Sequence, residues 1–104
     1  MLQINAENFD AEVVQSKIPV VIDFSASWCS PCHQFAPIFE KVAKQMEGKM
    51  KFAKCDIDAN QEFAQANGIM SIPCIVIFKN GQEAGRIVGN QTESSFVQQL
   101  KAAF

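Results

Sequence analysis

The sequence predicts a single α/β domain built around one mixed β-sheet with helices on its faces. The chain has 104 residues, which suits one domain and leaves no room for a second. Apolar residues make up 48% of it and include nine phenylalanines, enough for a core that stands without metals or crosslinks. Strand-like and helix-like segments follow one another in the order β-α-β-α-β-α-β-β-α, which predicts parallel crossovers and then a hairpin.

The first elements are a short strand, a helix and a buried strand. Residues 2–4 can form an edge strand, and Asn5 or Asn8 can then cap a helix that runs to about Ser16. Residues 20–24 are β-branched and nearly all apolar, which is typical of a strand covered on both faces. We therefore expect this segment at the centre of the sheet.

A longer helix should run from Pro31 to about Glu47. Its apolar residues recur at offsets of three and four: Phe35, Ile38, Phe39, Val42 and Met46. Pro31 suits the first turn, where a missing N–H costs nothing. Pro37 lies inside the helix and should kink it, because the carbonyl of His33 loses its partner.

The remaining elements end in a hairpin and a helix. Residues 51–57 predict a strand, followed by a short helix that Asn60 could cap and Gly68 could end. Asn80-Gly81-Gln82 separates two strand-like runs, which is a strong hairpin signal. A last helix from about Thr92 places three apolar side chains on one stripe: Phe96, Leu100 and Phe104.

Charge and composition exclude several classes of protein. The net charge is −2 and the nine Lys and Arg residues are scattered, which disfavours a nucleic-acid or membrane-surface binder. The first residues show no signal peptide, and no apolar run approaches the roughly 20 residues of a membrane helix. We expect a cytoplasmic protein, in which cysteines are more often catalytic or metal-binding than structural.

The segment Cys29-Ser30-Pro31-Cys32 lies between the buried strand and the long helix. A helix N-terminus offers free N–H groups and a partial positive charge, both of which stabilise a thiolate. Cys29 should therefore be the more reactive sulfur. Cys32, one turn into the helix, can return onto Cys29 and resolve a mixed disulfide formed with a substrate.

Asp23 places a carboxylate in the middle of the buried strand, beneath the cysteine pair. Burial should raise its pKa toward the range of a useful base. Lys54, in the third strand, is the available partner. Two interpretations stay open from these residues: a proton acceptor for the cysteines, or a buried ion pair with no catalytic part.

The chain resembles the thioredoxin family along nearly its whole length. The resemblance rests on Trp28-Cys29-Ser30-Pro31-Cys32, the Pro37 kink, Ser71-Ile72-Pro73 and Val88-Gly89, in that order. It implies one thioredoxin domain over residues 1–104, with the thioredoxin fold. It also implies a protein-disulfide reductase, a thiol-disulfide oxidoreductase that carries electrons through a reversible Cys29-Cys32 disulfide.

The resemblance further implies roles for other residues. Asp23, with Lys54 nearby, would handle the proton of the resolving cysteine through water. Pro73 would follow a cis peptide bond and let the backbone of Ile72 pair with an extended substrate. The family's substrate groove would include Pro31 and Gly89, and Trp28 would form either an apolar docking rim or half-buried packing.

Partners and cofactors follow from the same resemblance. A thioredoxin reductase drawing on NADPH would recharge the protein, and no cofactor need be bound. The substrates would be proteins that contain disulfides. We also expect a monomer.

Three residues depart from the commonest pattern of the family. Ser30 replaces a Gly and should change the reduction potential of the cysteine pair. His33 replaces a Lys and should make the reactivity of the Cys29 thiol more dependent on pH. The alternative for His33 is a solvated surface side chain. Cys74 replaces a Thr after Pro73 and is either a third active thiol or an inert core residue. Cys55, inside a strand, is expected in the core.

Other classes of function use the same cysteines. Cys29-x-x-Cys32-His33 matches the attachment string of c-type haem, but the chain holds only one histidine. A zinc site would add Cys55 or Cys74 to these three residues, but a second ligand pair is missing. A third alternative is an interaction module whose cysteines carry out no redox chemistry. Such a module would not need Asp23 in its central strand, so Asp23 favours the enzyme.

Overall fold

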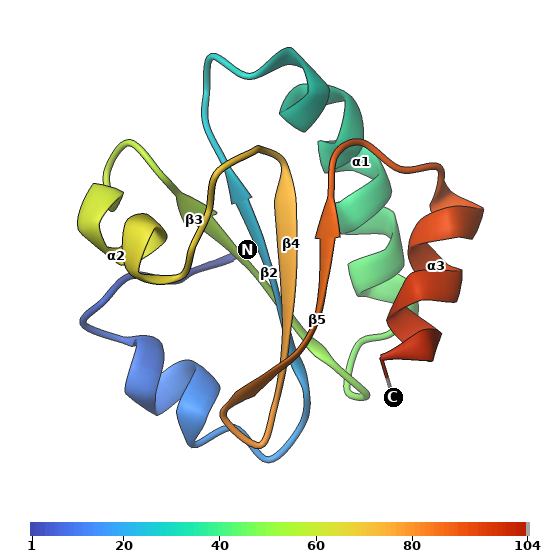
Figure 1. Cartoon of the computed structure of the whole chain (residues 1–104). Helices are drawn as coiled ribbons and strands as arrows, with labels where there is room; N and C mark the ends of the chain where they lie inside the picture. The colour runs from blue at the N-terminus through green and yellow to red at the C-terminus, as the bar shows by residue number, and fades with distance from the viewer. Residues whose placement is uncertain (104) are drawn as a thin grey trace.

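A five-stranded mixed sheet forms the centre of the computed structural model, which describes residues 1–103 (Figure 1). The strands are β1 (Leu2–Gln3), β2 (Val20–Ser25), β3 (Lys51–Asp56), β4 (Cys74–Lys79) and β5 (Gln82–Val88). They lie in the order β1-β3-β2-β4-β5. The predicted α/β class, the order of elements and the central place of residues 20–24 are confirmed.

The direction of β4 differs from the prediction. β1 and β2 each pair with β3 in parallel, as expected, but β4 runs antiparallel to β2. The reason is the length of the preceding helix, α2 (Gln61–Ala66). Its six residues rise about 9 Å, whereas a strand of six residues spans about 20 Å. The helix is too short to return the chain to the other end of the sheet, so β4 starts at the end where β3 stops.

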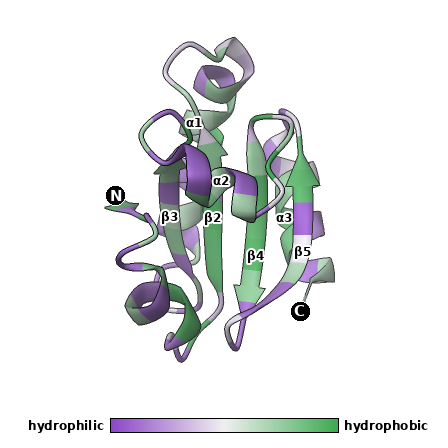
Figure 2. Cartoon of the chain, turned by 60° about the vertical axis from the view of Figure 1, so that its left-hand side comes forward, coloured by the Kyte–Doolittle hydropathy of each residue, from purple (hydrophilic) through white to green (hydrophobic). Residues whose placement is uncertain are grey.

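The helices cover both faces of the sheet. α1 (Ser30–Gln45) and α3 (Glu93–Ala102) pack on one face, and η1 (Asp10–Val14) and α2 on the other (Figure 1). Pro37 lies inside α1, as the sequence requires. Figure 2 shows β2 and β4 as the hydrophobic centre between these layers.

The sheet divides the core into two clusters. Successive residues of β2 point to opposite faces, so Val21 joins the cluster under α1 and α3, and Ile22 the cluster under η1 and α2. Phe39 of α1 is completely buried and packs against three other phenylalanine rings, with centroid distances of 5.4 to 6.0 Å. By the same alternation, Asp23 faces the side of the sheet that α1 covers.

The first helix is shorter and wider than predicted. An α-helix to about Ser16 was the expectation, but η1 is a five-residue π-helix, with Gln15 N donating to the Asp10 carbonyl at 3.0 Å. So short a segment takes its winding from packing against the sheet rather than from its own propensity. The Oδ1 atom of Asn5 accepts hydrogen bonds from the two backbone N–H groups of Glu7 and Asn8, and so caps the turn before η1.

One end of α2 matches its prediction and the other does not. Gly68 ends the helix, as predicted, in a left-handed conformation with φ of +68°. The predicted cap by Asn60 is wrong. Asn60 holds the N-cap position, but its Nδ2 donates to the carbonyl of Asp56 at 2.9 Å instead of accepting from the helix. The side-chain amide of Asn60 therefore pairs with the last backbone carbonyl of β3 and not with the N–H groups of α2.

The hairpin and the last helix match their predictions. Asn80 and Gly81 both have positive φ, at 55° and 78°, which is the geometry of a two-residue type I′ turn. A register shift between Ile77 and Phe78 follows in the β4–β5 ladder. Thr92 caps α3 by accepting from Ser95 N at 3.1 Å. Phe96 and Leu100 are fully buried, and Phe104 lies outside the described residues.

Candidate active site

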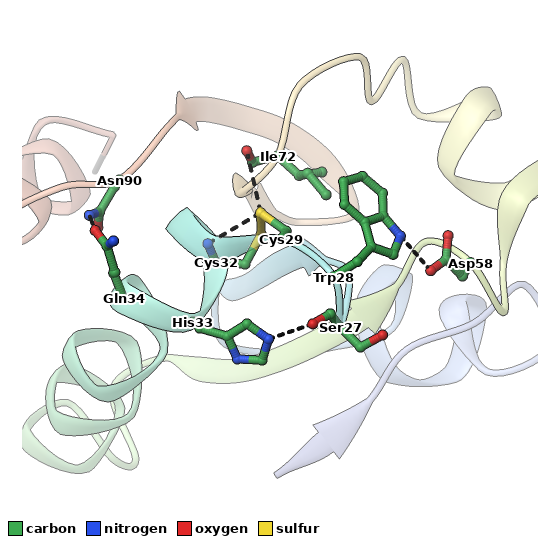
Figure 3. The surroundings of a disulfide bond; sticks show 9 residues. All are labelled: Ser27, Trp28, Cys29, Cys32, His33, Gln34, Asp58, Ile72 and Asn90. Atoms are coloured by element: carbon green, nitrogen blue, oxygen red, sulfur yellow. Dashed lines mark hydrogen bonds between the residues drawn. A yellow bond between two sulfur atoms is a disulfide. The ribbon is translucent and has the colours of Figure 1, made fainter.

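Cys29 and Cys32 form a disulfide at the point where β2 passes into α1 (Figure 3). Their Cα atoms are 5.3 Å apart, and Cys29 is the N-cap of the helix. The backbone N–H of Cys32 donates to Cys29 Sγ at 3.2 Å. In the reduced protein the same N–H and the positive end of the helix dipole would stabilise a thiolate on Cys29.

The disulfide lies at the surface but is mostly covered. Both cysteines are 5% exposed and pack with Ala26, while Ile57 and Ile72 lie against them. Because so little of each sulfur is accessible, a substrate disulfide can reach Cys29 only from the exposed side of this cluster.

The segment that flanks Cys29 contains the Ile72-Pro73 peptide bond, which is cis as the resemblance implied. The carbonyl oxygen of Ile72 lies 3.9 Å from Cys29 Sγ (Figure 3). The backbone N–H of Gly89, which has φ of +90°, donates to the carbonyl of Pro73 at 2.8 Å. This bond holds the loop after β5 beside the cis-proline segment.

Exposed apolar side chains lie on segments next to the disulfide. Trp28 is 68% exposed, and its Nε1 donates to Asp58 Oδ2 at 2.8 Å, which fixes the ring on the surface (Figure 3). This exposure favours the docking rim over the packing interpretation. Val88, before Gly89, is more than half exposed.

Asp23 lies beneath the disulfide and is almost completely buried, with 1% of its surface exposed. Its Oδ1 has no hydrogen-bond partner among the described residues. Burial raises the pKa of Asp23 to about 6, and the positive charge of Lys54 acts in the opposite direction. A group of that pKa can both take and return a proton near neutral pH.

An ion pair between Asp23 and Lys54, one of the two interpretations that the sequence left open, is not formed. The two residues are register partners on β2 and β3. However, Lys54 Nζ lies 3.6 Å from Glu40 Oε1 on α1, so the ammonium group is drawn toward the surface. Lys54 acts on Asp23 through its field and not through a direct contact.

A cavity of about 180 Å³ connects Asp23 with Cys32. The other residues that line it are Gln3, Ser25, Ala26, Ser27, His33, Ala36, Lys54 and Asp56. This volume is large enough for several water molecules, and its lining offers them polar partners. Water could therefore relay a proton between the carboxylate and the Cys32 sulfur.

The residues that depart from the family pattern have different environments. Ser30 and His33 are exposed, and the Nε2–H of His33 donates to the carbonyl of Ser27 at 2.5 Å (Figure 3). Cys74 is 2% exposed and belongs to the cluster under η1 and α2, where burial raises the pKa of its thiol. Cys55 is fully buried in the same cluster, and burial raises its pKa to about 11.

The sequence did not single out two residues of this region. Met70 precedes the cis-proline segment and is 95% exposed. Glu40 shows no distinctive spacing, because its contact with Lys54 joins elements that are distant in the sequence. The only available signal for Met70 was a large apolar residue in a loop beside Pro73.

Two other features of the structure are the arrangement of its possible metal ligands and the length of its helices. Across residues 1–103, no group of three or more His, Cys, Asp and Glu side chains is arranged to hold a metal ion. Within the same part of the chain, no helix has the length and apolar character needed to cross a membrane.

Comparison with known proteins gives consistent matches. The family model described as Thioredoxin matches residues 1–102. The chain is 41% identical over 92 residues to the thioredoxin of Rickettsia bellii, covering 88% of each protein. It is 40% identical over 99 residues to thioredoxin 1 of a Nostoc species, covering 95% of this chain and 92% of the relative. It is also 35% identical over 99 residues to a bifunctional thioredoxin reductase/thioredoxin of Mycobacterium leprae, of which it spans 22%.

Proposed function

The chain belongs to the thioredoxin family and is a thiol-disulfide oxidoreductase, and we propose that Cys29 attacks its substrates and Cys32 resolves them. One observation carries this assignment. The Cys29-Cys32 disulfide lies at the N-terminus of α1, and the N–H of Cys32 points at the sulfur of Cys29. That arrangement favours negative charge on Cys29 and leaves Cys32 as the second thiol.

Substrate binding is proposed along the cis-proline segment. Ile72 lies outside the helices and strands, so its backbone N–H and carbonyl can pair with an extended substrate in the manner of an added strand. The exposed side chains of Trp28, Met70 and Val88 supply apolar contacts around the disulfide. Pro31 and Gly89 border the same surface. Recognition of this kind depends little on substrate sequence.

The reductive cycle has two exchange steps. The Cys29 thiolate attacks one sulfur of the substrate disulfide, and the other substrate sulfur leaves as a thiolate. Cys32 then transfers its proton through water to the carboxylate of Asp23 and attacks Cys29 Sγ. The second substrate sulfur leaves, and the Cys29-Cys32 disulfide forms. The substrate gains two electrons and the cysteine pair loses two.

Regeneration requires two electrons from a partner. We propose a thioredoxin reductase that draws them from NADPH, with no cofactor bound to this chain. The relative from M. leprae supports this pairing, since its name joins a thioredoxin reductase and a thioredoxin in one protein. A cytoplasmic location fits the proposed direction of the reaction, because that compartment keeps thiols reduced. We also propose that residues 1–104 act as one monomeric thioredoxin domain.

The experiment that tests these roles is trapping of the mixed disulfide. Cys32→Ser removes the resolving thiol, so the variant should accumulate a covalent adduct through Cys29 when it is mixed with insulin whose disulfides are intact. The adduct should appear by mass spectrometry and disappear on treatment with dithiothreitol. Cys74→Ser, which leaves the pair intact, is the matched control and should trap nothing. Absence of an adduct with Cys32→Ser, or an adduct through Cys74, would contradict the assignment.

A further inference from the structure

Lys54 has two carboxylates within reach and contacts only one of them. Asp23 is its register partner on the neighbouring parallel strand, and both residues line the cavity beneath the disulfide. Lys54 Nζ nevertheless lies 3.6 Å from Glu40 Oε1. The Oδ1 atom of Asp23 is left without a hydrogen-bond partner among the described residues.

The difference in solvation between the two carboxylates explains why this arrangement matters. The side chain of Glu40 is 55% exposed, so its charge is well hydrated, whereas Asp23 is 1% exposed. An ammonium group beside a buried carboxylate would hold that carboxylate in its charged form and weaken it as a base. Burial is the main reason why Asp23 accepts a proton readily, and the position of Lys54 adjusts how strongly the opposing positive charge acts on it.

We propose that Glu40 is a positioning residue for the proton transfer step. By pairing with Lys54, it holds the ammonium group at the rim of the cavity and leaves Asp23 unpaired inside. This inference rests on the proposed role of Asp23 as the proton acceptor for Cys32. Glu40 itself contacts neither cysteine, and acts only through Lys54.

Other charged or titratable groups also face Asp23. Lys54 and Asp56 of β3 and Cys32 and His33 of α1 line the same cavity as Asp23. Cys74 of β4 lies on the opposite face of the sheet, where it feels the charge of Asp23 without facing it. Among the described residues, Glu40 is the acid that forms an ion pair with one of these groups. Its removal therefore changes the environment of Asp23 while it leaves the lining of the cavity intact.

The test is the substitution Glu40→Gln in the full chain. Released from Glu40, Lys54 should turn toward Asp23, and the pKa of the Asp23 carboxyl should fall by about one pH unit. Carbon NMR of the carboxyl group measures this directly, with no need for activity. The midpoint of the pH profile for the resolving step should move to lower pH by the same amount.

Two comparisons make the test specific. Glu93→Gln removes an acid from another ion pair of α1, formed with Lys41 at 2.8 Å, and should not change the pKa of Asp23. In a Lys54→Met background, Glu40→Gln should have no effect, because the residue through which it acts is missing. An unchanged pKa in Glu40→Gln, or an equal fall with and without Lys54, would overturn the proposal. Neither result would affect the trapping experiment, which tests the cysteine roles separately.

Discussion

Replacing Asp23 with Asn should stabilise the protein at neutral pH and have little effect on stability in acid. The folded protein holds this carboxylate in a nearly inaccessible position, with one oxygen unpaired among the described residues. Burial raises its pKa from the ordinary value of 3.8 to about 6, because the charged form loses its hydration. Asn keeps the shape of the side chain and carries no charge.

The size of the effect follows from the two pKa values. Between pH 3.8 and about 6 the folded state binds more protons at Asp23 than the unfolded state does, so the free energy of unfolding falls as the pH rises. Each pKa unit is worth about 1.4 kcal/mol, which gives a total loss of about 3 kcal/mol above pH 6. The variant escapes this loss, and its advantage should therefore grow by about 2.5 kcal/mol between pH 4 and pH 8, since a small part of the loss is already present at pH 4.

Urea unfolding of the oxidised protein, followed by circular dichroism at several pH values, measures this difference. Glu7→Gln, which removes one exposed negative charge, is the matched control and should show no pH-dependent gain. An advantage for Asp23→Asn that stays constant from pH 4 to pH 8 would show that the charge of Asp23 does not destabilise the fold.

Three other predictions concern the core, the hairpin and the free thiols. Phe39→Ala should cost about 3–5 kcal/mol in urea unfolding, since it leaves a cavity among three phenylalanine rings, and a cost under 1 kcal/mol would contradict the packing. Gly81→Ala should cost about 1–2 kcal/mol, because φ is +78° and a Cβ would meet Val14 Cγ1 at 3.2 Å; an unchanged melting temperature would refute this. Cys55 and Cys74 should not react with Ellman's reagent in the native oxidised protein, and both should react after unfolding. Rapid native labelling of either thiol would contradict their burial.

Features of the fold that depend on local sequence were predictable. The buried strand β2 follows from its run of apolar β-branched residues, and the hairpin turn from Asn80-Gly81. The cysteine pair could be placed at the start of α1 because Pro31 and the apolar spacing mark that helix. The cis bond before Pro73 came from the resemblance to a family, since few X-Pro bonds are cis.

Features that depend on contacts between distant segments were not predictable. Asn60 occupies a capping position, but the carbonyl of Asp56 attracts its side chain. Lys54 and Asp23 are correctly placed as neighbours, yet Glu40 of α1 takes the ammonium group. In both cases the competing partner comes from another element, which periodicity and spacing do not reveal. The antiparallel course of β4 is different, because it follows from the shortness of α2, which Asn60 and Gly68 already mark in the sequence.

The outer strands of the sheet discourage association between copies of the protein. An exposed strand edge is a template for pairing with another chain, and short, charged or irregular edges reduce that hazard. β1 has only two residues, and β5 carries the paired charges of Glu83 and Arg86 beside a register shift. We expect the protein to resist edge-to-edge aggregation at high concentration, which would keep the end of the sheet that bears the disulfide free for its partners.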